Sequence, residues 1–404
     1  MGARMMVVGA DILIIGQQPW DVELGSNCKN IARELSKNNR VLYVNSPLDR
    51  VTWLRGMNNP KVKKRLNVIK GKRPGLVELQ HNLWNYYPDC WAESINWISN
   101  DFMFDAINKL NNKRFSVSIL KALTSLGFKD VILINDQEII KGFYLKEYLQ
   151  PKLSIYYCRD YIIGVDYWKK HGVKLESELI RKTDLCVSNS EYLNDYCKSF
   201  NLNSFNVGQG CDFTGFFADF YSKPADLQNL EGTIIGYVGA LSSIRLDIEI
   251  LKHIANSFPE CYIVLVGPED NEFKSSELHD LSNVHFLGQK PAHQLPSYIS
   301  FFDLCINPQL VNEITIGNYP RKVDEYLAFG KPVVASKTKT METFASYTYL
   351  ASTKEEYVEL IQKALADDST DLRTRRINYA LTHTWHNSVQ EIYKAINSTL
   401  KSSK

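Results

Sequence analysis

The sequence predicts an α/β protein with two doubly wound domains, each built on a parallel sheet that is covered by helices. Short apolar runs bounded by turns alternate with helical patterns along the chain. The runs lack a polar face, which is typical of parallel strands buried on both sides. An irregular polar stretch between Asp212 and Glu231 divides the alternation into two series. Because ligands of such sheets bind beyond the carboxyl ends of the strands, we expect the domains to face a central cleft.

The two series define the expected domains. We assign residues 1–215 to an N-terminal domain, 232–382 to a C-terminal domain, and 383–404 to a C-terminal helix that packs back onto the N-terminal domain. The first series contains a helix at about Asn27–Lys37 and the strands Asp11–Ile15, Arg40–Val44, Val131–Ile134, Leu153–Tyr157 and Leu185–Val187. The second contains helices at Asp247–Ser257 and Leu295–Phe302 and the strands Thr233–Val238, Tyr262–Val266, Val284–Leu287, Leu304–Ile306 and Pro332–Ala335.

Composition excludes several classes of function. The 404 residues carry a net charge of only +2, and no nucleic-acid-binding motif is present, so we expect no nucleic-acid partner. The eight cysteines are scattered without metal-ligand spacing, which argues against a zinc site or a disulfide framework and fits a reducing cytosol. No apolar run has the length of a membrane span, and the N-terminus does not fit a signal peptide. We expect a cytoplasmic protein, soluble or peripheral at the membrane, without a cofactor or metal.

The segment Asn307–Ser336, NPQLVNEITIGNYPRKVDEYLAFGKPVVAS, is the most informative part of the chain. It predicts a polar loop, a short helix at Val323–Phe329 with Glu325 in its first turn, and a buried strand. A loop that leads into a helix N-terminus can bind an anion, and Lys322 adds a mobile charge suited to phosphate. The alternative is an ordinary loop–helix–strand unit that binds nothing, in which Glu325 only complements the helix dipole.

Glycines follow the strands of the second series. Gly239, Gly267 and Gly288 each come directly after an apolar run, and Arg245 follows the first of them. A glycine lets a phosphate approach the backbone, and an arginine can bind a diphosphate with two parallel hydrogen bonds. The alternatives are tight turns for the glycines and a solvated cation for Arg245. Neither the dinucleotide-binding nor the P-loop glycine pattern is present.

The motifs GYVGALSSIRLD, VLVGPED, VHFLGQKPAHQLPSYISFFDLCINP and YPRKVDEYLAFGKPVVAS resemble the C-terminal half of GT-B glycosyltransferases, of the group 1 or family 4 type and especially its teichuronic-acid-type members. VSNSEYLNDY and WDVELGSNCKNIARELSKNNRVLYVNSP resemble parts of the N-terminal half. The likeness covers most of the chain and is weak at about 50–150. It implies two Rossmann-like domains, a sugar nucleotide such as a UDP- or GDP-sugar as donor, no essential metal, and a retaining outcome.

The resemblance implies roles for individual residues. Gly239 and Arg245 hold the diphosphate with Lys322, Glu325 binds the ribose, and Gly288 and Gln289 lie by the base. Further donor-binding positions lie on the remaining loops of the two domains: Gly267, Thr315, Gly317, Asn318, Tyr319, Gly25 and Ser26. Two positions depart from the family, since Gly317 replaces the first Glu of the E-x7-E pair and Ala240 replaces an arginine.

Three carboxylate and cation features complete the sequence-based candidates. Asp160, after the strand that ends at Tyr157, is our candidate for acceptor positioning or base chemistry, with a helix N-cap as the alternative. Asp136 is a weaker candidate at another strand end. Residues 50–73 carry nine cations and no Asp or Glu beside Trp53, Leu54 and Met57, which suits an anionic membrane surface, or else a solvated cationic helix face.

We therefore expect a glycosyltransferase that moves a sugar from a nucleoside-diphosphate sugar to a glycan or a lipid-linked acceptor, with Lys322, Arg245 and Asp160 as catalytic residues. Two alternatives remain at this point. One is a related GT-B epimerase, and the other is a catalytically silent protein that binds a glycan or a nucleotide, suggested by the glycine at position 317.

Overall fold

The computed structural model describes residues 7–22, 26–216 and 220–402. The chain folds into two compact units, and each is described by itself. Unit 1 contains Met1–Gly208 together with Trp385–Lys404, and unit 2 contains Gln209–Thr384. The irregular stretch before residue 232, which the sequence analysis left between the domains, belongs to unit 2. There Cys211 pairs with Thr384 as an isolated parallel bridge, so the two crossings of the chain between the units lie side by side.

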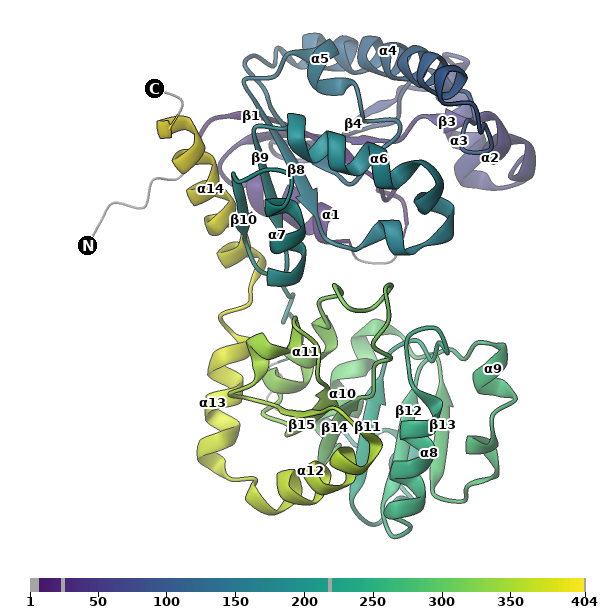
Figure 1. Cartoon of the computed structure of the whole chain (residues 1–404), viewed down its shortest axis with the longest axis vertical. Coiled ribbons are helices and arrows are strands. Elements are labelled where there is room, and N and C mark those ends of the chain that lie inside the picture. Colours follow the sequence, from purple (N-terminus) through teal and green to yellow (C-terminus); the bar gives the residue numbers. More distant parts are fainter. Residues whose placement is uncertain (1–6, 23–25, 217–219, 403–404) are drawn as a thin grey trace. The chain divides into compact units, whose positions relative to one another are not determined.

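Unit 1 has an eight-stranded sheet in the order β10-β9-β8-β7-β1-β2-β5-β4 (Figure 1). All its neighbours are parallel except the antiparallel pair β4 and β5. The strands are β1 Asp11–Gly16, β2 Arg40–Asn45, β4 Leu76–Gln80, β5 Leu83–Tyr86, β7 Ile132–Asp136, β8 Leu153–Cys158, β9 Leu185–Ser188 and β10 Ser204–Asn206. A separate parallel pair joins β3 Leu48–Asp49 and β6 Trp91–Ala92. Each strand predicted for this region is present, with small shifts at its ends.

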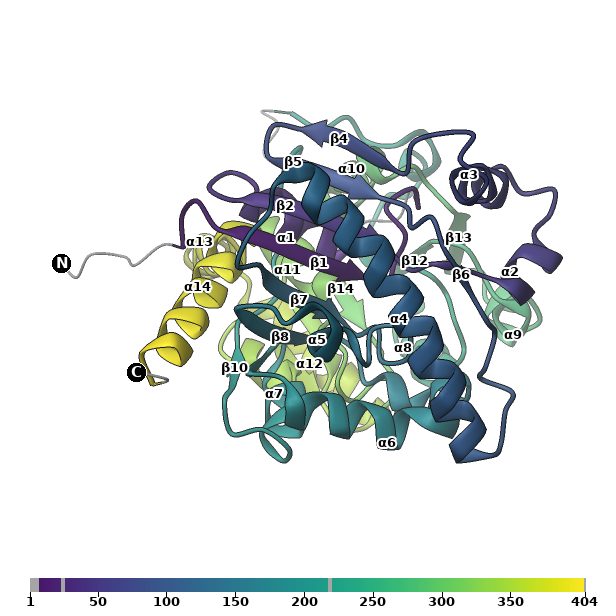
Figure 2. The ribbon, with the colours of Figure 1, turned by 90° about the horizontal axis from the view of Figure 1, so that it is seen from above.

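Helices cover both faces of this sheet. One face packs against α1 Asn27–Leu35 and α14 Trp385–Ser402, and the other against α4 Asp101–Leu126, α5 Leu145–Leu149, α6 Asp166–Lys182 and α7 Glu191–Lys198. Two short helices, α2 Arg50–Arg55 and α3 Pro60–Ile69, follow β3. Figure 2 shows α4 running across unit 1 with its outer side uncovered. The sequence analysis had assigned no helix here, because α4 has no clear apolar stripe of helical period.

Unit 2 has a six-stranded parallel sheet in the order β13-β12-β11-β14-β15-β16. Its strands are β11 Ile234–Val238, β12 Tyr262–Val266, β13 Val284–Gly288, β14 Leu304–Asn307, β15 Val333–Ser336 and β16 Tyr349–Ala351. One face packs on α8 Ile248–Ser257, α9 Asn271–Lys274 and α12 Lys354–Asp367, and the other on α10 Leu295–Ser300, α11 Arg321–Ala328 and α13 Thr370–Ala380. The strand order reverses between β11 and β14, so a crevice is expected where their carboxyl ends diverge.

One predicted helix begins earlier than expected. The sequence analysis started it at Val323. In the structure, α11 starts at Arg321, directly after Pro320. The first-turn carboxylate is therefore Asp324, and Glu325 lies in the second turn, so the alternative of Glu325 as a first-turn dipole partner is wrong.

The structure also bears on membrane association. Within residues 7–22, 26–216 and 220–402, no helix combines the length and the hydropathy that a membrane span requires.

The C-terminal helix α14 supplies core to unit 1, which gives a first prediction. Ile392 is 2% exposed and belongs to the same cluster as Ile12 and Ile31. Ile392→Ala should lower the free energy of unfolding of unit 1 by about 2–5 kcal/mol, the usual cost of a buried cavity of this size. Urea denaturation followed by circular dichroism measures this loss. Lys401→Ala, an exposed change on the same helix, should have almost no effect, and equal effects of both changes would contradict the packing.

Candidate active site

In unit 2, the loops that follow β11 and β14 are joined by backbone hydrogen bonds. The N–H of Asp247 donates to the Pro308 carbonyl at 2.9 Å, and the N–H of Leu310 donates to the Arg245 carbonyl at 2.8 Å. The Asn312 side chain donates to the Ile244 carbonyl at 3.1 Å. Two loops that are far apart in sequence thus form one surface at the switch point of the sheet, where a doubly wound fold binds its ligand.

Two glycines are required where this surface meets the strand ends. Gly239 has φ 148° and Gly267 has φ 155°, a region that side-chain-bearing residues rarely adopt. A Cβ on Gly267 would lie 1.9 Å from the carbonyl oxygen of Gly239, and a Cβ on Gly239 would lie 2.9 Å from the Lys322 ammonium. The turn after β11 therefore admits no side chain at Gly239 or Gly267, and the Lys322 ammonium lies directly beside the backbone of Gly239.

The ammonium of Lys322 lies above the carboxyl end of β11. It donates to the Tyr237 hydroxyl and lies 4.2 Å from the centroid of the Tyr237 ring. An aromatic ring and a hydroxyl hold the cation without cancelling its charge, so the charge remains available to an anion. The sequence analysis named Lys322 and Gly239 but missed Tyr237, whose place near the end of β11 was the only available signal.

The other charged candidates of unit 2 differ in exposure. Arg245 is exposed, and its guanidinium forms no ion pair with any residue that the structure describes. Glu325 is half-buried and lies 3.5 Å from the Arg321 guanidinium. Burial raises the pKa of the Glu325 carboxyl, and Arg321 opposes that shift. A carboxyl of this kind can accept hydrogen bonds from ligand hydroxyls in a partly dry site.

The loop between β14 and α11 is organised around Thr315. Its side chain is 1% exposed, and its hydroxyl donates to the Leu310 carbonyl while accepting the N–H of Asn312 at 3.1 Å. Gln309 donates to the Thr315 carbonyl at 2.8 Å. The Thr315 side chain therefore supports the loop, and its contact with a ligand stays a prediction.

The other predicted positions of this loop, Gly317 to Tyr319, follow Thr315 in the chain. Gly317 is buried, whereas Asn318 and Tyr319 are half-buried. The Tyr319 hydroxyl lies 3.3 Å from Nδ1 of His383. Gly317 and Asn318 stay predictions as sugar contacts.

A buried acid links α11 to the end of unit 2. Asp324 is fully buried, with one oxygen 2.6 Å from Nδ1 of His383 and the other 3.4 Å from the Cys211 sulfur. The sequence analysis missed this contact, because Cys211 and His383 come from the two opposite ends of the unit. Asp324 thus fixes the helix that carries Lys322 and Glu325.

The predicted base-binding positions lie at the edge of the sheet. Gly288 ends β13, which is two strands from β11, about 10 Å at the usual strand spacing. No atom lies within 4 Å of the place that a Cβ on Gly288 would take, and Gln289 is exposed. The position is therefore open to a ligand.

In unit 1, Arg159 connects the ends of three strands. Its guanidinium donates to Asp136 at 2.8 Å, to Asp160 at 2.5 Å and to Gln17 at 2.9 Å. Asp136 is fully buried, and one of its oxygens has no hydrogen-bond partner among the residues that the structure describes. Burial raises the pKa of Asp136, and Arg159 opposes that shift. The sequence analysis named Asp136 and Asp160 but not the arginine between them.

Asp160 is the exposed member of this group. Its side chain is 44% exposed, and its backbone N–H donates to the Gln137 side chain at 3.0 Å. The helix N-cap alternative for Asp160 is wrong, because α6 begins at Asp166 and is capped by Val165. A carboxylate that is fixed by an arginine and open on one side can accept a hydrogen bond from an acceptor hydroxyl.

Gln137 holds the loop on which Asp160 lies. It has φ 51°, and its amide donates to the Asp160 carbonyl at 2.7 Å. Behind it, the buried Glu176 accepts hydrogen bonds from the hydroxyls of Tyr156 at 2.6 Å and Tyr196 at 3.0 Å. Burial raises the pKa of the Glu176 carboxyl. This supporting network was not predicted, since its members come from four separate segments.

The first loop of unit 1 is described only in part. Ser26 is 5% exposed, and its hydroxyl caps α1 by accepting the N–H of Lys29 at 3.4 Å. Gly25, the other candidate on this loop, lies outside the described residues.

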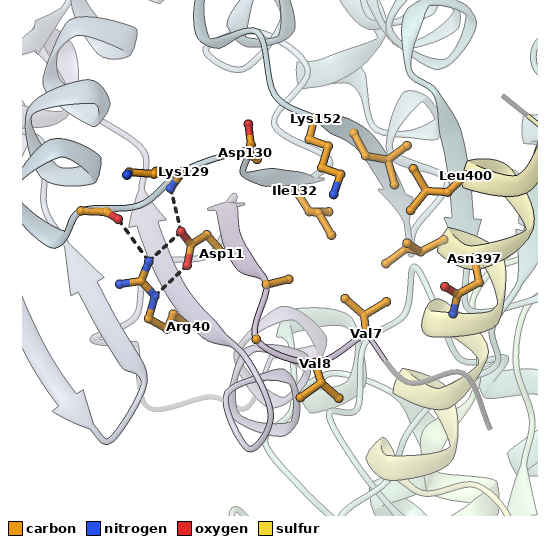
Figure 3. Close-up of a pocket in the computed structure, with 15 residues that line it drawn as sticks. Val7, Val8, Asp11, Arg40, Lys129, Asp130, Ile132, Lys152, Asn397 and Leu400 are labelled. Atoms are coloured by element: carbon orange, nitrogen blue, oxygen red, sulfur yellow. Dashed lines mark hydrogen bonds and ion pairs between the residues drawn. The ribbon is translucent and has the colours of Figure 1, made fainter. Parts of the chain in front are cut away.

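A cavity of about 560 Å³ lies at the opposite edge of the unit 1 sheet, at the amino ends of β1, β7 and β8 (Figure 3). Asp11 in its wall is held by Arg40 at 2.7 Å and by the backbone N–H of Lys129 at 2.7 Å. These charges neutralise one another, and the edge is the one that doubly wound sheets do not use for ligands. In the described part of the chain, no group of three or more His, Cys, Asp or Glu side chains is arranged to hold a metal ion.

Comparison with known proteins agrees with this geometry. Residues 222–383 match the family model of glycosyl transferases group 1. A protein of Bacillus subtilis (strain 168) named as a teichuronic acid biosynthesis glycosyltransferase, TuaH, an assignment that is itself provisional, is 26% identical over 231 residues. That match covers 54% of this chain and 58% of the relative, so the two are related over little more than half of their lengths.

Solved structures resemble the chain over nearly its whole length. Sucrose-phosphate synthase of Thermosynechococcus elongatus aligns with 98% of this chain and 100% of its own, at a TM-score of 0.68 and 14% identity. Anabaena Alr3699/HepE in complex with UDP aligns with 97% of this chain and 100% of its own, at a TM-score of 0.63 and 16% identity. The chain therefore has the GT-B fold of two Rossmann-like domains, and within it residues 222–383 match the family model of glycosyl transferases group 1.

Proposed function

We propose that the chain is a glycosyltransferase that moves a sugar from a nucleoside-diphosphate sugar to a glycan or a lipid-linked acceptor. The observation that carries this proposal is the ammonium of Lys322 beside the backbone of Gly239, at the switch point of a group 1 domain. A cation held at this place stabilises the negative charge that develops on a leaving diphosphate.

The donor half of the proposed reaction belongs to unit 2. Lys322 and Arg245 neutralise the diphosphate, Glu325 binds the ribose, and Gly288 with Gln289 borders the base. We propose that these cations, without a metal ion, carry the charge of the leaving group. UDP is the first nucleotide to test, because Anabaena HepE has been solved with UDP and with UDP-glucose.

The acceptor half belongs to unit 1. Arg159 holds Asp160 in place by an ion pair, and Asp136 fixes Arg159 from the buried side. An ionised carboxylate orients an acceptor hydroxyl and lowers the cost of removing its proton. We propose a retaining outcome, which the family resemblance supports, and product analysis by NMR with a donor of known anomeric configuration tests it.

We also propose that residues 50–73 contact an anionic membrane surface from the cytoplasmic side. The structure distinguishes two kinds of cation in this segment. Lys64 and Arg65 turn inward, lying 3.8 and 3.1 Å from Asp21 and over the Tyr87 ring. The exposed cations without an ion pair in the described part of the chain are Arg55, Lys61, Lys63, Lys70, Lys72 and Arg73. Exposed cations of this kind attract anionic lipids.

The donor site gives the decisive prediction. UDP or another nucleoside diphosphate should raise the melting temperature of the protein, because a ligand of the folded state stabilises it. Lys322→Ala and Arg245→Ala should each reduce this shift and lower the rate of transfer roughly a hundredfold or more, since each removes charge stabilisation from the leaving group. Lys363→Ala, an exposed change on α12, should alter neither. Full turnover by Lys322→Ala would refute the diphosphate assignment.

The acceptor site gives a separate prediction. Asp160→Asn should leave the thermal shift by UDP unchanged and lower transfer by about 10²–10⁴-fold, the usual contribution of a positioned acid or base. Asp166→Asn, an exposed carboxylate at the start of α6, serves as the control. If Asp160→Asn and Asp166→Asn were equally active, Asp160 would have no part in the acceptor step. Nucleotide binding without transfer to any acceptor would favour the silent binding protein instead.

The basic segment gives a third test. Co-sedimentation with vesicles that contain phosphatidylglycerol should weaken as salt is added, and K61Q/K63Q should lower it roughly tenfold or more, at about 1 kcal/mol for each cation near the surface. K129Q/K152Q removes two exposed cations at the opposite edge of the sheet and is the matched control. Equal binding by both double variants would remove the membrane proposal for this segment.

A further inference from the structure

Helix α4 packs Phe115 and Ile119 against the sheet, but it also buries several polar side chains and exposes several large apolar ones. Its side chains toward the protein include Asn108, Asn111, Asn112, Ser116 and Ser118, which are all at most 3% exposed. Its exposed side chains include Phe102, Met103, Leu110, Val117 and Leu120, which are 42–83% exposed. A helix on the surface of a globular protein normally has the opposite arrangement.

The buried polar face has a structural explanation. The Asn111 side chain accepts the N–H of Glu93 at 2.8 Å and donates to the Glu93 carbonyl at 2.9 Å. Asn112 donates to the Ile140 carbonyl at 3.0 Å and accepts the N–H of Tyr144 at 3.0 Å. These side chains satisfy irregular backbone that would otherwise be buried without partners. No such explanation exists for the apolar outer face.

The exposed apolar side chains gather most closely at the N-terminal end of α4. We name Trp97, Phe102, Met103 and Tyr167 the aromatic edge; they are 73%, 83%, 53% and 59% exposed. Hydrogen bonds join its parts, since Asn96 donates to the Tyr167 carbonyl at 2.8 Å and Lys170 donates to the Trp97 carbonyl at 2.9 Å. Single exposed apolar residues are ordinary, but a cluster with two or three large aromatic rings marks an interaction surface.

The aromatic edge is continuous with the basic segment. Ser94, three residues before Trp97, accepts the N–H of Val51 at 3.0 Å and donates to Asp49 at 2.8 Å. Asp49 caps α2, so α2 and the aromatic edge are held to the same short connection. Leu54 on α2 is itself 61% exposed. The apolar surface therefore adjoins the exposed cations that follow α2.

The aromatic edge also adjoins the acceptor site. The chain runs from Asp160 at the carboxyl end of β8 through a short connection, Ile162–Gly164, to Tyr167 at the start of α6. The N-terminus of α4 belongs to the same edge of the sheet, because α4 ends just before the amino end of β7. A surface that covers the aromatic edge would thus lie beside Asp160.

We propose that the aromatic edge inserts into the interfacial region of a phospholipid bilayer, and that the acceptor is consequently lipid-linked. The inference rests on the proposed function, which left two classes of acceptor open, and it selects the lipid-linked acceptor over the glycan. Tryptophan and other aromatic side chains favour the level of the lipid headgroups, and nearby lysines and arginines favour anionic lipids. A second copy of the chain is the less suitable occupant, because self-association would bring the cations of two basic segments together.

Vesicle binding at high salt tests the proposal apart from the electrostatic contact. The wild-type chain should co-sediment with vesicles of phosphatidylcholine mixed with phosphatidylglycerol, and part of this binding should persist at about 1 M salt, where charges are screened beyond about 3 Å. W97S/F102S should lower the salt-resistant binding about tenfold or more, because buried apolar area sets its strength. Leu202→Ser is the matched control, since Leu202 is 91% exposed at the opposite edge of the sheet.

The results of the vesicle experiment can be told apart from those of the experiments on the donor site. W97S/F102S should retain the thermal shift by UDP, which shows that the variant folds and that the nucleotide site is intact. Salt-resistant binding that W97S/F102S loses and Leu202→Ser keeps supports the proposal. Equal binding by W97S/F102S and the wild type, absence of salt-resistant binding by the wild type, or a wild-type dimer that W97S/F102S abolishes would each overturn it. If the wild-type chain does not bind UDP, the donor proposal is refuted, whereas the vesicle result still stands.

Discussion

In both units, the direction of the strands is the constraint on which the rest of the structure depends. Parallel strands send all their carboxyl ends to one edge, and a reversal of strand order leaves a place between two neighbouring loops at that edge. In unit 2 this place lies between β11 and β14, and in unit 1 between β1 and β7. Glycines, cations and carboxylates that are distant in sequence meet there because the sheet brings their strands together.

The two units prepare their charges in different ways. In unit 2, Lys322 rests on the hydroxyl and ring of Tyr237, so its charge is oriented and left uncompensated. In unit 1, Arg159 is shared between a buried acid, Asp136, and an exposed one, Asp160. The first arrangement suits binding of an anion from outside, and the second suits fixing a carboxylate for a neutral hydroxyl. This difference is the physical basis for assigning donor and acceptor to different units.

The outer face of α4 has to be explained together with the contacts that its inner face makes in unit 1. Its inward asparagines and serines bind the irregular chain around residues 86–93 and 138–144 and share the inner face with Phe115 and Ile119, while other apolar residues of the helix lie on the outside. Pairing with backbone groups offsets most of the cost of burying the Asn111 and Asn112 side chains. An outer face that is apolar beside cations is then free to serve as an interaction surface, which is why the interior and the surface of this helix have to be explained together.

The sequence by itself determined the fold class, most of the central strands of both sheets, and the residues that follow them; β4, β5, β10 and β16 were not predicted. Gly239, Lys322 and Asp160 could be named because apolar runs, glycine and adjacent charge are local signals. The tertiary structure decided which residues act on one another. Three arrangements depend on contacts between distant segments, which a single sequence does not indicate. They are Tyr237 under Lys322, Arg159 between two acids, and Asp324 between Cys211 and His383. It also showed that Thr315 supports its own loop and that Lys64 and Arg65 turn inward, because hydrogen bonding and burial are properties of the folded chain.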